Sequence, residues 1–269
     1  MSDVSSIGVV GLGKMGRPIA RHLISAGYTV HGIDVSPEAT AAAKAFGTQI
    51  VTKASALAAQ CDLIIVLTAY EQQVEDVVFG ADGLVAGAKP GTIIAVGATI
   101  NPAGMMDIAE RLAKHGLTAL DIPICRGEGA AEAGKLLITG GGEANAFERC
   151  RKAFSTFADS VHRLGDVGSG QVGKMVNNLI LWACISANTE GFKLAQQYGV
   201  DVDAMRNMLL DSSAQNWAMS TQVDRYPMPW AEKDMMIVLS EADRLRLSLP
   251  LCGSVKEVIK GIKIARGEK

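Results

Sequence analysis

Apolar runs and amphipathic segments alternate over the first 164 residues. Short apolar runs predict strands at 7–10, 30–34, 48–51, 61–67, 91–96, 117–121 and 135–142. Segments with helical spacing fall at 17–26, 37–46, 55–60, 72–79, 102–115 and 144–157. The run at 61–67 is apolar at nearly every position, as in a central strand covered on both faces. This alternation is typical of a parallel sheet with helices on its faces.

The pattern changes near the glycine-containing segment 166–170. Beyond it no strand signal is evident, and helical segments follow at 179–195, 202–210, 234–247 and 250–265. We therefore predict an α/β protein with an N-terminal Rossmann-type, doubly wound sheet over residues 1–164. An all-helical domain follows over residues 165–269, and we expect it to serve substrate binding and oligomerisation.

The first predicted strand leads into three glycines at G-x-G-x-x-G spacing. In this motif the first glycine permits the tight turn, the second lets a pyrophosphate approach the backbone, and the third lets helix pack on strand. Phosphate then meets the N–H groups at a helix N-terminus. The predicted dinucleotide-binding residues of this loop are Gly11, Leu12, Gly13, Lys14, Met15 and Gly16.

The end of the next strand indicates which dinucleotide binds. Asp34 lies 18 positions after Gly16, where a carboxylate accepts hydrogen bonds from ribose hydroxyls and repels a 2′-phosphate. We therefore predict NAD rather than NADP. Leu67 ends the strand 61–67 and Thr68 follows it, at the edge where open α/β sheets bind ligands, and both are predicted to contact the cofactor as well.

Composition argues against several other classes of protein. With 26 basic and 28 acidic residues the net charge is −2, so we expect neither nucleic acid nor a membrane as partner. Five scattered cysteines without a C-x-x-C pair favour a reducing, cytoplasmic location. The four histidines are expected on helix or strand surfaces without forming a ligand cluster, so we predict no metal; they are His22, His31, His115 and His162.

A candidate catalytic group lies where the two predicted domains meet. Lys174, Asn177 and Asn178 share one face of the predicted helix because they are three and four residues apart. A lysine ammonium can protonate a carbonyl oxygen as hydride reaches its carbon, and can take the proton back in the oxidation direction. From these residues alone, a solvated lysine with capping asparagines is an equally good interpretation.

Four motifs in order make the chain resemble the β-hydroxyacid dehydrogenase family, which includes 3-hydroxyisobutyrate dehydrogenases. They are Gly11–Gly16, Asp121–Gly127 with Ala131–Gly134, Gly170-x-x-Gly173-Lys174-x-x-Asn177-Asn178, and Lys233-Asp234. The resemblance implies that Lys174 is the catalytic acid/base and that Asn178, with Asn177, binds substrate. It also implies that Lys233 lies near nicotinamide and substrate, and that Thr99 lies near the nicotinamide ribose.

The predicted substrate loop departs from the family pattern of a serine and two glycines. Here the aligned residues are Cys125, Arg126 and Gly127. An arginine fork suits a carboxylate, sulfonate or phosphate, and its placement is similar to that in sulfolactaldehyde reductases of the same family. Alternatively, Arg126 is a surface residue paired with Glu128 or Glu132. Cys125 is expected to be a small packing residue rather than a nucleophile.

These observations predict an oxidoreductase that transfers hydride between NAD and a small β-hydroxyacid or short anionic aldehyde, with a lysine as general acid/base. One alternative is an enzyme similar to sulfolactaldehyde reductase, acting on a sulfonated three-carbon substrate. The rival from another class is a non-catalytic NAD-binding interaction protein. A homodimer or homotetramer is expected.

Overall fold

A computed structural model describes residues 4–268 and divides the chain into two compact units, Met1–Lys174 and Met175–Lys269. The first unit is a mainly parallel sheet with helices, and the second is helical, which confirms the predicted fold class. Helix α8 (Ser169–Gln197) begins in the first unit and continues through the second. The exact domain boundary after residue 164 stays a prediction.

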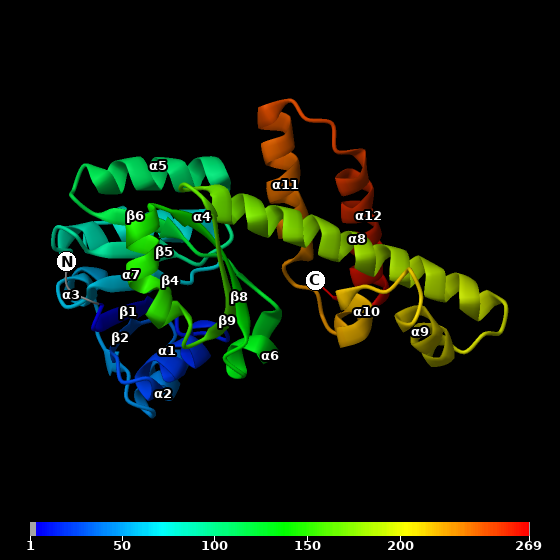
Figure 1. Cartoon of the computed structure of the whole chain (residues 1–269), viewed down its shortest axis with the longest axis horizontal. Coiled ribbons are helices and arrows are strands. Elements are labelled where there is room, and N and C mark those ends of the chain that lie inside the picture. The colour runs from blue at the N-terminus through cyan, green and yellow to red at the C-terminus, as the bar shows by residue number, and fades with distance from the viewer. Residues whose placement is uncertain (1–3, 269) are drawn as a thin grey trace. The chain divides into compact units, whose positions relative to one another are not determined.

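The sheet of the first unit has the strand order β3-β2-β1-β4-β5-β6-β8-β7, with β9 paired to β8 (Figure 1). The strands β3, β2, β1, β4, β5 and β6 run parallel to one another. Strand β8 is antiparallel to β6 and β7, and β9 is parallel to β8. The strands are β1 (Ser6–Val10), β2 (Thr29–Ile33), β3 (Gln49–Ile50), β4 (Leu63–Val66), β5 (Ile93–Val96), β6 (Thr118–Asp121), β7 (Ile124–Cys125), β8 (Leu136–Gly142) and β9 (Ala158–Gly165).

Helices connect these strands. They are α1 (Gly16–Ser25), α2 (Pro37–Lys44), α3 (Ala54–Ala58), α4 (Glu71–Phe79), the 3-10 turn η1 (Leu84–Ala86), α5 (Pro102–Ala113), α6 (Gly127–Glu132) and α7 (Ala144–Phe154). Strand β4 shows how the core is divided: Leu63 and Ile65 belong to one apolar cluster, while Ile64 and Val66 belong to another. All four are fully buried, so the strand is covered on both faces as predicted.

Four short or polar elements differ from the predictions. Strands β7 and β9 and helices α6 and α10 (Trp217–Thr221) have no counterpart among the predicted segments. Helix α7 ends at Phe154 instead of continuing to residue 157, and the fully buried Phe157 is the residue before β9. His31 was expected on a surface, but it is buried, and burial lowers its pKa.

The second unit consists of α8 beyond Lys174, α9 (Val202–Leu210), α10, the 3-10 turn η2 (Val223–Arg225), α11 (Ala231–Leu245) and α12 (Pro250–Ala265). Its core contains Trp182, whose indole Nε1 donates to Asp234 Oδ2 at 3.1 Å.

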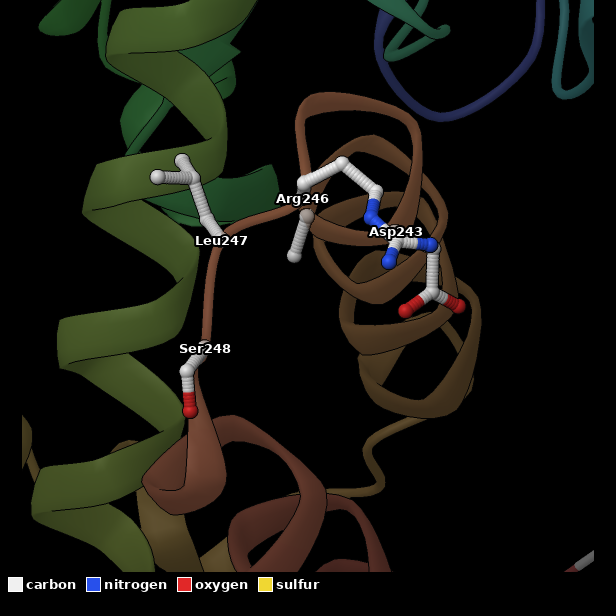
Figure 2. A pocket seen from close by; sticks show the side chains of 5 residues that line it. Asp243, Arg246, Leu247 and Ser248 are labelled. Carbon is white, nitrogen blue, oxygen red and sulfur yellow. The ribbon is translucent and has the colours of Figure 1, made fainter.

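Figure 2 shows a pocket at the end of α11. Asp243 and Arg246 project beside it, and the chain continues through Leu247 and Ser248. No predicted site residue lines this pocket.

A buried carboxylate anchors the start of α8. Asp121, the last residue of β6, is fully buried. Its Oδ1 accepts from the Gly168 N–H at 3.0 Å and its Oδ2 accepts from the Gln171 N–H at 2.8 Å. These donors belong to the first turn of a helix, which otherwise lacks intrahelical partners. The carboxylate therefore fixes the start of α8 to the carboxyl end of β6.

We predict that Asp121→Asn destabilises the first unit by roughly 1–3 kcal/mol, because the amide nitrogen would face a backbone N–H donor that has lost its acceptor. Urea unfolding followed by circular dichroism measures this free energy. Asp107→Asn is the matched control: Asp107 is exposed and pairs with Arg111 on its own helix, so about 0.5 kcal/mol or less should be lost. Equal effects of the two variants would contradict the anchoring role.

Candidate active site

The carboxyl ends of four parallel strands lie side by side. In the registers of the sheet, Val10 pairs with Val66, Val66 with Val96, and Val96 with Asp121. The residues that follow these strands therefore emerge at one edge. In an open α/β sheet this is the edge where ligands bind.

The glycine loop at this edge has the geometry that a dinucleotide requires. Gly11 has φ +89°, and a Cβ there would lie 2.8 Å from the Leu67 carbonyl oxygen. A Cβ on Gly16 would lie 1.7 Å from the Gly11 carbonyl oxygen, so only glycine fits. By contrast, Gly13 is exposed with no heavy atom within 4 Å of such a Cβ. That open space is where a pyrophosphate can approach the backbone.

Asp34 holds the loop from the end of β2. Its Oδ2 accepts from the Leu12 N–H at 2.6 Å, and its Oδ1 accepts from the Ser36 N–H at 2.8 Å. The carboxylate is half-buried, and each oxygen keeps a lone pair for a further donor. Asp34 thus both orders the glycine loop and presents acceptors beside it, which fits the adenosine ribose of a nicotinamide dinucleotide.

The neighbouring strand ends supply Leu67, Thr68 and Thr99. The Leu67 N–H donates to the Val10 carbonyl oxygen at 2.8 Å and places the residue next to the glycine loop. Thr68 has a buried hydroxyl without a hydrogen-bond partner among the described residues. A buried hydroxyl without a partner costs free energy, so this group suits a ligand that supplies one. Thr99 is half-buried, three residues after β5.

Lys174 lies two turns into α8, over the end of β7. Its Nζ donates to the Ile124 carbonyl oxygen at 2.7 Å and lies 3.8 Å from Cys125 Sγ. Close packing of α8 on the sheet makes this possible: a Cβ on Gly170 would lie 2.5 Å from the Thr139 carbonyl oxygen, and one on Gly173 would lie 2.4 Å from Leu164 Cδ1. The glycines of this motif therefore bring the lysine down onto the strand ends.

Arg126 points to a different partner from those expected. Its Nη1 donates to Asp159 Oδ1 at 2.5 Å and to the Lys135 carbonyl oxygen at 3.0 Å. The guanidinium is a third exposed. Glu128 and Glu132 pair instead with Lys14 and Arg21.

Arg126 and Gly127 also shape the backbone of the loop. They adopt left-handed conformations, with φ +84° and +76°. This conformation is unusual for a residue with a side chain. The chain therefore turns sharply from β7 into α6, directly after the strand that holds Cys125, which is buried.

The remaining predicted residues belong to the second unit. Asn177 and Asn178 lie on α8 three and four residues after Lys174, and Asn177 Nδ2 donates to Asn178 Oδ1 at 2.9 Å. Lys233 lies in the first turn of α11, with its Nζ 5.8 Å from the centroid of the Trp230 ring.

Two residues that position the site were not identified from the sequence. Asp121 anchors α8, and burial raises the pKa of its carboxyl group although backbone N–H donors oppose the shift. Gln171 is fully buried and ties α8 to both neighbours of Thr99: its Oε1 accepts from the Ile100 N–H, and its Nε2 donates to the Ala98 carbonyl oxygen at 2.8 Å. Asp121 begins the motif Asp121–Gly127, and Gln171 follows the first glycine of the motif that contains Lys174. Their places in these motifs were the sequence signal for a positioning role.

Within residues 4–268, no group of three or more histidine, cysteine, aspartate or glutamate side chains could hold a metal ion. The helices of the same range include none that is long and apolar enough to span a membrane.

Family comparisons cover nearly the whole chain. Residues 6–165 match the family model described as the NAD-binding domain of 6-phosphogluconate dehydrogenase. Residues 168–269 match the model described as NAD-binding of NADP-dependent 3-hydroxyisobutyrate dehydrogenase. The first unit is therefore a nicotinamide dinucleotide-binding domain, as its glycine loop indicates.

Individual relatives agree with these matches. An L-threonate dehydrogenase of Cupriavidus necator is 31% identical over 263 residues, covering 94% of this chain and 89% of the relative. A 3-hydroxyisobutyrate dehydrogenase of Pseudomonas aeruginosa is 31% identical over 265 residues, covering 92% and 89%. The solved 3-hydroxyisobutyrate dehydrogenase of Mycobacterium tuberculosis shares the fold, with a TM-score of 0.87 at 23% identity over 97% of this chain and 94% of that one.

The glycine loop, the strand-end acid and the two family matches lead to one conclusion: this chain belongs to the β-hydroxyacid dehydrogenase family and is a nicotinamide-dependent dehydrogenase.

Proposed function

We propose that the protein interconverts a small β-hydroxyacid and its aldehyde or ketone, with Lys174 as general acid/base. The observation that carries this proposal is the position of the Lys174 ammonium at the ligand-binding edge of the sheet, held at 2.7 Å by the Ile124 carbonyl oxygen. An ammonium has three N–H groups; one donates to Ile124 and one faces Cys125 Sγ, which leaves a proton for a substrate oxygen. A bound nicotinamide would supply the hydride acceptor or donor.

Substrate positioning is assigned to the residues around Lys174. Asn177 and Asn178 follow it by three and four residues, which places their amides on the same side of α8. Amide groups at that spacing can orient a hydroxyl or carboxylate beside the lysine. Lys233, with Cys125 of β7 and Gly127 at the start of α6, completes the proposed substrate site.

The substrate class is a short carboxylate. The relatives that match this chain are named for L-threonate and 3-hydroxyisobutyrate, both of which are small hydroxyacids. A sulfonated three-carbon substrate is the second candidate because Arg126 can bind either anion. The ion pair of Arg126 with Asp159 is partly exposed, so it contributes about 1 kcal/mol at most. We propose that Arg126 exchanges Asp159 for the substrate anion.

NAD is proposed as the preferred dinucleotide, because the Asp34 carboxylate lies where a 2′-phosphate would need a cation.

We also propose that the protein forms a homodimer or homotetramer. The second unit exposes large apolar side chains such as Leu194, Tyr198 and Ile264, and contacts between subunits would remove them from water.

Lys174→Ala should lower kcat by roughly 10²–10⁴-fold, because proton transfer to the substrate oxygen loses its donor. NAD affinity should change little, since the glycine loop is untouched. Absorbance of the reduced nicotinamide measures turnover with L-threonate and 3-hydroxyisobutyrate, and fluorescence titration measures NAD binding. Lys152→Ala, at an exposed position of α7 in the same unit, is the control. Full turnover by the Lys174 variant would remove this residue from the mechanism.

Asp34→Ala should lower the ratio of kcat/KM for NAD over NADP by about tenfold or more, because acceptors for the ribose hydroxyls are lost together with the charge that opposes a 2′-phosphate. Steady-state kinetics with both dinucleotides test this. Glu38→Ala, in the first turn of α2 and exposed, should leave the ratio unchanged. A wild-type enzyme that works better with NADP would contradict the assignment of Asp34.

If Arg126 exchanges the Asp159 carboxylate for the substrate anion, substitutions of Arg126 and of Asp159 should change the substrate KM in opposite directions. Arg126→Ala should raise the KM for a carboxylate substrate about tenfold, since a charged hydrogen bond is lost. Asp159→Asn should lower the same KM by up to about fivefold, because the competing partner is weakened. If Arg126 served only to hold the loop, both variants would shift KM in the same direction.

A further inference from the structure

The second unit contains a pocket that the dehydrogenase reaction does not use. It has a volume of about 350 Å³ and is lined by side chains of α8, α9, η2 and α12, all beyond Lys174. That volume lies within the range of small-molecule sites. Apolar side chains, among them Val202 and Ile262, share its wall with four basic residues.

The basic residues that line the pocket outnumber the acidic residues that line it. Lys193, Arg206, Arg225 and Arg266 line the pocket, whereas Asp224 is the one acid among the lining residues. Neighbouring acids outside the wall reduce the excess: Asp203 pairs with Arg225 and Glu268 lies 3.6 Å from Arg266. These are four cations and three anions in all. The remaining positive charge is that of Lys193, which makes no ion pair within the described part of the chain.

Arg206 provides an independent sign that a ligand belongs here. The residue is 3% exposed. Its guanidinium lies 4.7 Å from the centroid of the Phe192 ring and donates to both carboxylate oxygens of Asp224 and to the Met219 carbonyl oxygen. Its Nε is buried without a hydrogen-bond partner among the described residues. Since an unmade hydrogen bond of a buried charged group is costly, this donor favours an acceptor brought into the pocket.

We infer that this pocket is a second binding site, for a compact molecule bearing a phosphate or carboxylate group. Oxyanions match the donors present, an ammonium and guanidinium groups, and they form charge-assisted hydrogen bonds with both. The Thr189 hydroxyl, which also lines the pocket, already donates to the Ile185 carbonyl oxygen at 2.8 Å, so the donors for an anion are the basic side chains. The site would allow an anion to act on the helical unit without competing for the glycine loop.

Inorganic phosphate, titrated at constant ionic strength into the full-length protein with labelled isoleucine methyl groups, tests the site. The Ile262 signal, assigned with Ile262→Val, reports from the pocket wall. We expect it to shift and to saturate. In Lys193→Glu the apparent affinity should fall about tenfold, because one charge-assisted contact becomes repulsive. Lys193 is exposed, so its replacement should leave the fold intact.

Lys260→Glu is the matched control. It makes the same change of charge on α12, where the Lys260 ammonium binds Glu257 outside the pocket. This variant should keep the wild-type affinity for phosphate. An Ile262 signal that stays in place, a shift that never saturates, or equal losses in the two charge-reversal variants would overturn the assignment. The titration uses neither dinucleotide nor hydroxyacid, so its failure would leave the proposed reaction untouched.

Discussion

The bond between the Asp121 carboxylate and the start of α8 is the interaction on which the rest of this site depends. Burial of the carboxylate disfavours its charged form and raises its pKa. Backbone N–H groups of Gly168 and Gln171, at the positive end of the helix dipole, oppose that cost. The result is a helix whose first turn is fixed to the carboxyl end of β6. Because Lys174 lies on the same helix, three residues after Gln171, this contact also fixes the position of the Lys174 backbone.

Close packing around that anchor explains glycines that would otherwise weaken a helix and a strand. A Cβ on Gly141 would lie 2.4 Å from Asp121 Oδ1, and one on Gly170 would lie 2.7 Å from Asp121 Oδ2. Glycine in the middle of a helix costs about 1 kcal/mol relative to alanine. Here that cost is offset by the hydrogen bonds that the close approach allows, so the glycines, the acid and the lysine form one structural unit.

The sequence predicted those parts of the protein that repeat a pattern. Buried parallel strands such as β4 are continuous apolar runs, and α9 and α12 have the bounds that their periodicity indicates. The polar edge strand β9 was not predicted because its larger apolar residues, Val161 and Leu164, are three positions apart and do not alternate with polar ones. For the same reason the pairing of Arg126 with Asp159 could not be foreseen: Asp159 lies 33 residues away in a strand without a signal. Motif spacing placed Lys174 and Asp34, but not the backbone donors that hold Asp34.

The division of the chain at Lys174 has a mechanical consequence for the proposed site. Lys174 is the last residue of the first unit, and Asn178 belongs to the second. Both are carried by one uninterrupted helix, in which residues four apart have Cβ atoms about 6 Å apart. The Cβ spacing between the proposed proton donor and the proposed substrate-binding amide is therefore fixed by helical hydrogen bonds. Motions of the two units can change what approaches this helix, but they leave that spacing intact.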